Sequence, residues 1–191
     1  MKRRAVRLAA AAFGLLTVAA AQAQPVPEDR SREGRFKNEY ELEQDRLNWK
    51  EGEVKLPPYP KTEGLIEFFV SGASSFRFFI DPASLSPGNK DGVVRYTLVA
   101  RSPSGVANVS HEGIRCSTNS YKVYALGNEG RWSARESDWR AIEPRSVQRW
   151  HLELRSRYFC PGNAPIYTAA EGVAFLRSGG YRVGADAARG N

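Results

Sequence analysis

The sequence predicts an α+β fold: an antiparallel β-sheet meander of about 5–7 strands, covered by one or two C-terminal helices and tied to them by a disulfide. Three observations indicate this. Four short segments separated by turn residues fill Val93–Trp132, and an apolar stripe at helical spacing follows over Arg145–Tyr158. Of the chain's two cysteines, Cys116 lies inside the first of these regions and Cys160 lies just after the second.

The N-terminus has the pattern of a secretory signal peptide. Its basic start, apolar run and small-residue cleavage signal are Lys2–Arg7, Leu8–Ala20 and Ala21–Ala23. The apolar run is shorter than the roughly 20 residues of a membrane span, which favours a leader cleaved near Ala23 over an uncleaved signal anchor. We therefore expect a periplasmic protein with no transmembrane segment in the mature chain.

The net charge of +7 overstates how basic the mature protein is. Four of the positive charges lie in the leader, at Lys2, Arg3, Arg4 and Arg7, so the mature chain carries +3. The high isoelectric point is therefore partly a targeting feature, and we expect no nucleic-acid partner.

Residues 24–55 are dense in charge of both signs and poor in apolar side chains. Such a segment buries too little surface to offset its ordering entropy, so we expect a flexible tail with at most a loose helix over Glu39–Trp49. Leu56–Pro60 (LPPYP) then reads as an extended polyproline-type segment. It is either a ligand for an aromatic groove or, as we favour, a segment laid over the protein's own sheet. The globular domain is expected at residues 56–180.

Aromatic and β-branched runs at Leu65–Val70 and Phe76–Ile80 predict two adjacent strands. Asp81 followed by Pro82 suggests one helical turn over Pro82–Leu85. The strands of the central meander are expected at Val94–Ala100, Ala107–Cys116 and Tyr121–Ala125. In the second of these the apolar alternation slips, which suggests a β-bulge at Gly113.

The C-terminal part predicts an edge strand and two helices. Trp139–Ile142 forms the strand, and Arg145–Tyr158 forms a helix that Cys160-Pro161 closes. Thr168 and Glu171 form a capping box for a second helix over Ala169–Ser178, which Gly179-Gly180 ends. Residues 181–191 are expected to be a flexible tail.

An exported chain with two cysteines favours one structural disulfide, Cys116–Cys160, over two free buried thiols. The two residues are 44 positions apart, and closing such a loop stabilises the fold by about 4 kcal/mol. A metal site is not expected, because Cys116, Cys160, His111 and His151 match no standard ligand spacing.

The order of these segments resembles the CNP-like family of exported proteobacterial proteins, named after the cryptic neisserial protein. The matching segments are LPPYP (Leu56–Pro60), FFIDPASLSPG (Phe78–Gly88), DGVVRYTLVARSPSG (Asp91–Gly105), NVSHEGIRC (Asn108–Cys116), YKVYALG (Tyr121–Gly127) and YFCPG (Tyr158–Gly162). The resemblance implies an exported single domain and assigns no catalytic residues.

The sequence shows no catalytic constellation. His111 and Glu112 are neighbours on a predicted strand and so point to opposite faces, and Ser110 lacks a G-x-S-x-G elbow. No phosphate loop or metal motif is present, so no cofactor is expected. A periplasmic hydrolase with an unrecognised site is the alternative to a binding module. A deep pocket where His111, Glu112 or His151 converge would favour it.

A binding or scaffold module of the cell envelope fits the composition better. Arginines alternate with tryptophan and tyrosine through the core, a combination suited to carboxylates, phosphates and glycans. The candidate binding residues are Arg115, Lys122 and Tyr124, which we expect on one face of the sheet. The expected partner is an envelope protein, a glycan or an anionic ligand. Solvated arginines beside core aromatics are the alternative interpretation.

Overall fold

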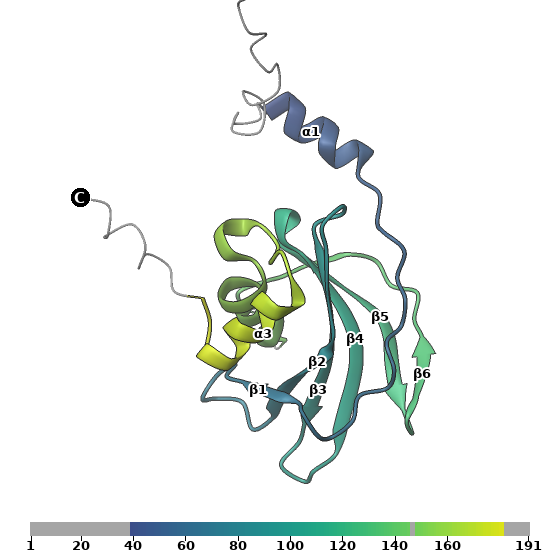
Figure 1. The fold of residues 1–191 in the computed structure, drawn as a ribbon, viewed down its shortest axis with the longest axis vertical. Coiled ribbons are helices and arrows are strands. Elements are labelled where there is room, and N and C mark those ends of the chain that lie inside the picture. The colour runs from purple at the N-terminus through teal and green to yellow at the C-terminus, as the bar shows by residue number, and fades with distance from the viewer. Residues whose placement is uncertain (1–38, 146–147, 182–191) are drawn as a thin grey trace, which may run out of the picture. The chain divides into compact units, whose positions relative to one another are not determined.

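The computed structural model describes residues 39–145 and 148–181 (Figure 1). The chain divides into two compact units, residues 1–46 and 47–191. Helix α1, Glu39–Asn48, crosses this boundary and matches the loose helix predicted there. Its Tyr40 and Leu47 are exposed, as expected for a helix without an apolar face. The predicted leader, residues 24–38 of the predicted N-terminal tail and residues 182–191 lie outside the described residues.

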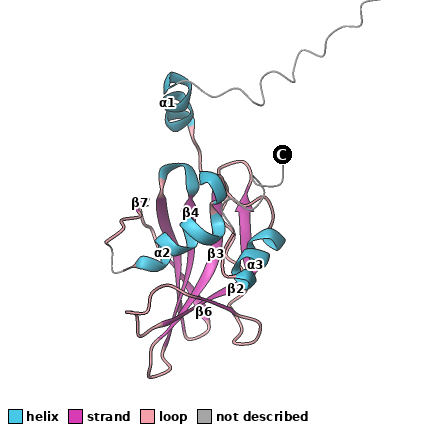
Figure 2. Cartoon of the chain, turned by 90° about the vertical axis from the view of Figure 1, so that its left-hand side faces the viewer, coloured by secondary structure: helices cyan, strands magenta, loops and turns pink. Residues whose placement is uncertain are grey.

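The second unit is built on one antiparallel sheet, as predicted, with strands in the order β1-β2-β3-β4-β5-β6 and β7 beside β5 (Figures 1 and 2). Each strand from β2 to β6 pairs with the one before it in the chain, because short connections join them. The strands are Ile66–Phe68 (β1), Arg77–Gly88 (β2), Val93–Arg101 (β3), Ala107–Arg115 (β4), Ser120–Asn128 (β5), Arg131–Ala134 (β6) and Arg140–Ala141 (β7).

The helices cover one face of this sheet (Figures 1 and 2). Helix α2, Arg149–Glu153, continues as a π-helix over Leu154–Phe159, and α3, Ala169–Ser178, has the predicted bounds. Thr168 caps α3 by accepting a hydrogen bond from the Glu171 N–H at 3.1 Å. The main core lies between these helices and the strands, with Tyr96, Ile114, Leu154 and Phe159 fully buried.

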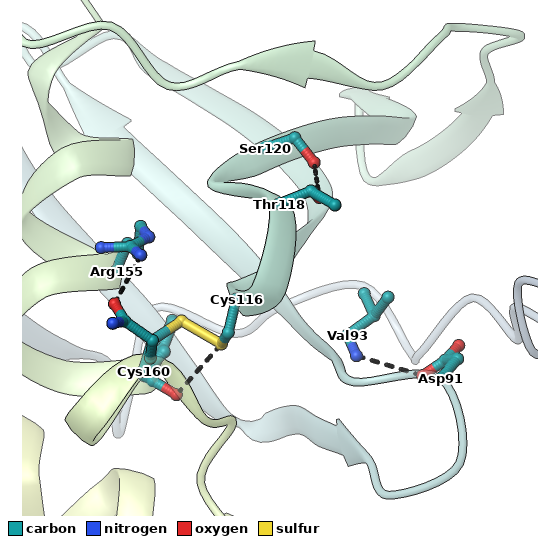
Figure 3. The surroundings of a disulfide bond; sticks show 9 residues. Asp91, Val93, Cys116, Thr118, Ser120, Arg155 and Cys160 are labelled. Atoms are coloured by element: carbon teal, nitrogen blue, oxygen red, sulfur yellow. Dashed lines mark hydrogen bonds between the residues drawn. A yellow bond between two sulfur atoms is a disulfide. The ribbon is translucent and has the colours of Figure 1, made fainter. Parts of the chain in front are cut away.

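The predicted disulfide joins the sheet to the helices (Figure 3). Cys116 opens a 3₁₀ turn after β4, and Cys160 follows the π-helix. Their Cα atoms are 5.6 Å apart, and the two residues are 1 % and 2 % exposed. The bond therefore lies inside the core and fixes the end of the helical layer on the sheet.

The opposite face of the sheet carries the segment that we call the strap, residues 49–60. Figure 1 shows it in dark blue alongside β5 and β6. The Trp132 indole N–H donates to the Pro57 carbonyl at 2.8 Å, and the Tyr59 ring packs on Trp132 at 5.2 Å between centroids. Gly127 permits this approach, because a Cβ there would lie 2.7 Å from the Tyr59 hydroxyl oxygen. The Leu56–Pro60 segment thus covers the protein's own sheet.

Because both faces are covered, β3 is buried on both sides from Val93 to Ala100. Tyr96 and Leu98 belong to the main core. Val99 packs with Phe79 and Val109 in a second, smaller cluster next to Tyr59 and Trp132. The apparent slip in the apolar alternation of β4 has the same cause. Val109 packs on the strap face and Ile114 on the helix face, and the register of β4 against β3 does not change.

Two local predictions were wrong. Pro82–Leu85 is not a helical turn but part of β2, with an irregularity against β3 between Asp81 and Ser86. Prolines follow both of these residues and drive them into the extended region. The bulge is not at Gly113: the register of β4 against β5 shifts between His111 and Glu112, and Tyr124 is the extra residue on β5.

The outer edge of β5 is interrupted. β6 and β7 both pair with it, and residues 135–139 between them form no strand. The Ser137 side chain closes this gap: its hydroxyl donates to the Val123 carbonyl at 2.7 Å, and its oxygen accepts from the Val123 N–H at 3.3 Å. A single side chain thus takes the place of a backbone partner at Val123.

Candidate functional site

The predicted binding residues Arg115, Lys122 and Tyr124 lie on the strap face, and the structure brings them together. Arg115 ends β4, and Lys122 and Tyr124 belong to the neighbouring β5. Gly113, which pairs with Lys122, leaves room for the Tyr124 ring, because a Cβ there would lie 2.6 Å from its hydroxyl oxygen. With Arg95 of β3 and Trp139 before β7, these residues form a surface that we call the cradle.

A carboxylate of the strap occupies the centre of the cradle. Lys122 Nζ lies 2.9 Å from Glu51 Oε2, and the Tyr124 hydroxyl donates to Glu51 Oε1 at 2.7 Å. Arg95 Nη2 stands 3.9 Å from the same Oε1. Burial, together with the hydrogen bond donated to Glu51, raises the pKa of Tyr124, so its hydroxyl remains a proton donor. The cradle therefore binds a carboxylate with two donors and a nearby guanidinium.

An indole of the strap lies beside this carboxylate. The Arg115 guanidinium carbon stands 3.7 Å from the centroid of the Trp49 ring, within the range of a cation–π contact. Trp49 also meets the Trp139 ring edge-on at 5.9 Å, and its N–H donates to the Asp91 carbonyl at 2.8 Å. Arg115 thus contacts an aromatic side chain of the strap upstream of Leu56–Pro60.

The floor of the cradle is the Asp91–Arg95 ion pair, whose Nη2 and Oδ2 atoms are 2.6 Å apart. Burial raises the pKa of Asp91, but hydrogen bonds from Arg95 and from the N–H groups of Gly52 and Val93 outweigh it and lower the pKa overall. The sequence prediction missed this pair. Its signal is an acid in the turn, four residues before an arginine of the strand that follows.

Lys122 and Tyr124, which hold Glu51, also line a cavity of about 590 Å³. Lys122 and Tyr124 line it from the sheet, Val54 and Leu56 from the strap, and residues 134–138 from the β6–β7 connection. Lys122 and Tyr124 therefore contact the strap carboxylate and also border open space.

Glu112 and His151, named for the enzyme alternative, do converge, on the helix face. His151 Nε2 lies 2.9 Å from Glu112 Oε2, while the hydroxyls of Ser110 and Tyr96 donate to the same carboxylate at 2.6 and 2.9 Å. Burial raises the pKa of Glu112, and the three partners, His151 first, lower it below its usual value. Ser110 contacts Glu112 and not the imidazole, so this is no serine–histidine pair.

His111 lies on the strap face, away from Glu112, as adjacent strand residues must. Its Nδ1 is 3.3 Å from the Thr97 hydroxyl, and its ring contacts Tyr124 and Trp132. Burial lowers the pKa of His111 to about 4, so it is neutral at pH 7. His111 therefore packs as a neutral side chain against Tyr124 and Trp132 on the strap face.

Among residues 39–145 and 148–181, no group of three or more His, Cys, Asp or Glu side chains has an arrangement suited to a metal ion. None of the helices in these same residues is long and apolar enough to cross a membrane.

Comparison with known proteins identifies a family. A profile of the CNP1-like family matches residues 44–177. The chain is 28% identical over 138 residues to cryptic neisserial protein 1 of Neisseria gonorrhoeae (strain ATCC 700825 / FA 1090), which covers 63% of this chain and 68% of the relative. No solved structure matches. The matched region contains the strap, the whole sheet and most of α3, and we conclude that the chain belongs to the CNP1-like family.

Proposed function

We propose that this protein is exported to the periplasm, with its leader cleaved near Ala23, and acts there as a non-catalytic binding module of the cell envelope. The leader pattern and the buried Cys116–Cys160 disulfide support export, because disulfides form and persist in oxidising compartments.

The observation that carries the binding role is the Glu51 carboxylate held by Lys122 and Tyr124, two residues that also line a cavity of about 590 Å³. Charge-assisted hydrogen bonds of this kind are stronger than neutral ones. The site is therefore suited to an anionic ligand that bears a carboxylate and enters beside Glu51.

The hydrolase alternative rests on one observation, that His151 lines a second cavity of about 520 Å³ with Tyr121 and Gln148. His151 is 1 % exposed and its Nε2 faces Glu112. The pair anchors α2 on β4, and this geometry favours the binding module.

The mature protein should begin at Gln24, and N-terminal sequencing of periplasmic material checks this.

Titration with N-acetylglutamate should shift the amide NMR signals of Lys122, Tyr124 and Val54. Lys122→Ala should weaken this binding about tenfold, which is the loss of one charged hydrogen bond. Lys61→Ala, at an exposed lysine outside the cavity lining, is the matched control. Cytoplasmic retention, or shifts that persist in Lys122→Ala, would contradict the proposal.

A further inference from the structure

We propose that the cradle recognises an extended peptide segment of a partner protein, one that carries an aromatic residue and, two positions later, a carboxylate. This inference rests on the proposed function and names its ligand class. Trp49 and Glu51 of the strap hold the place of that segment in the free protein.

The spacing of the strap contacts points to this ligand. In an extended chain, residues two positions apart face the same side. Trp49 and Glu51 both contact the cradle, while Lys50 between them is exposed. Arg115 and Trp139 take the indole, and Lys122 and Tyr124 take the carboxylate. A lone anion fills only the second of these subsites, whereas a peptide fills both.

The backbone directly after the carboxylate residue is also recognised. The Gly52 N–H donates to Asp91 Oδ2 at 2.8 Å, and Arg95 Nη2 lies 3.4 Å from the Gly52 carbonyl oxygen. These contacts use a main-chain donor and a main-chain acceptor that every peptide offers. The cradle thus binds main-chain groups of an extended segment as well as two of its side chains.

The strap is less deeply buried than the strands, as expected for a segment that another ligand can displace. No residue from Trp49 to Pro60 is fully buried, whereas Val93, Val94 and Tyr96 beneath the two faces are 0% exposed. Displacing the strap therefore costs little apolar burial compared with displacing a strand. The cavity of about 590 Å³ gives a competing segment a route to Lys122 and Tyr124.

The test uses the peptide Ac-Asn-Trp-Lys-Glu-Gly-Glu-amide, which copies residues 48–53. The receptor is the full mature chain carrying Trp49→Ala and Glu51→Ala, in which both subsites are vacated. By isothermal titration calorimetry the peptide should bind this variant at least tenfold more tightly than the wild type. Replacing the peptide's first glutamate by glutamine, or adding Lys122→Ala to the receptor, should remove the gain. Glu53→Ala, at an exposed strap residue, is the control that leaves wild-type affinity unchanged.

Glu51→Gln provides a second receptor that keeps the shape of the strap if the double variant fails to fold. The peptide should bind it at least threefold more tightly than the wild type. Equal affinity for vacated and wild-type chains would overturn the inference. If N-acetylglutamate still shifts Lys122 in that case, the proposed anion site stands and only the peptide class is wrong. If the vacated variant pairs with wild-type chain in sedimentation, the occupant is the strap of a second copy, which overturns the external partner.

Discussion

Glu112 links the helical layer to the sheet. Its carboxylate, 3% exposed, is held by His151 of α2 and by the hydroxyls of Tyr96 and Ser110. Breaking a buried pair leaves the remaining partner desolvated and uncompensated. The network therefore stabilises the fold because the buried Glu112 carboxylate has three partners, and not through the charge of Glu112 alone.

Glu112→Gln should lower the free energy of unfolding by about 3 kcal/mol, because the amide cannot accept from all three donors at full strength. Urea unfolding at pH 7 measures this. Glu53→Gln, at an exposed position, should leave the free energy of unfolding unchanged. A loss below about 1 kcal/mol for Glu112→Gln would show that the network is replaceable.

His111 should make stability depend on pH. Its folded pKa of about 4 lies below the ordinary 6.5, so the unfolded chain binds more protons between these values. The free energy of unfolding should thus fall as pH drops from 6.5 towards 4, by at most about 1.4 kcal/mol per pH unit from this residue. Urea unfolding at several pH values should show a weaker slope for His111→Gln than for the wild type. If the free energy of unfolding of His111→Gln has the same pH dependence as that of the wild type, another group is responsible for it. Glu112, with its lowered pKa, loses its contribution only at lower pH.

At the scale of the element, the disulfide holds the π-helix end on the sheet. Cys160→Ser should lower the free energy of unfolding by about 4 kcal/mol, the chain-entropy value for a separation of 44 residues. The far-ultraviolet circular dichroism of the sheet should persist, because neither cysteine belongs to a strand. Thermal melting with and without reductant checks this: an unchanged midpoint would contradict the expectation, and the reduced wild type should melt like the variant.

Elements with a local signal could be predicted from sequence, and elements defined by distant contacts could not. Thr168, Glu171 and Gly179 mark both ends of α3, and the structure has the same bounds. Glu51 carries no local signal, since a glutamate in a charged segment is normally solvated. Its role in the cradle depends on contacts with Lys122 and Tyr124, which are more than 70 residues away in the sequence. The second compact unit includes Glu51, since it begins at Leu47.

At the scale of the whole molecule, the strap should decide where proteases stop. Trypsin should trim the mature chain upstream of Trp49 and cut slowly at Lys50 and Lys55, because strap contacts at Glu51, Gly52 and Pro57 hold the backbone on the sheet. Gly127→Ala, which pushes the Tyr59 ring outward, should accelerate these two cuts. Mass spectrometry of timed digests measures both rates. Equal rates in wild type and variant would show that Tyr59 does not fasten the strap.

The interrupted edge at Ser137 has a consequence for how these molecules coexist in a crowded compartment. A long, uninterrupted outer strand offers a row of main-chain donors and acceptors on which another sheet can grow. Here that row is divided into a four-residue strand and a two-residue strand, and one hydroxyl occupies the groups of Val123 between them. The opposite outer strand, Ile66–Phe68, has only three residues. Within the described residues the outer strands are therefore short, and we expect the sheet to be a poor template for edge-to-edge polymerisation.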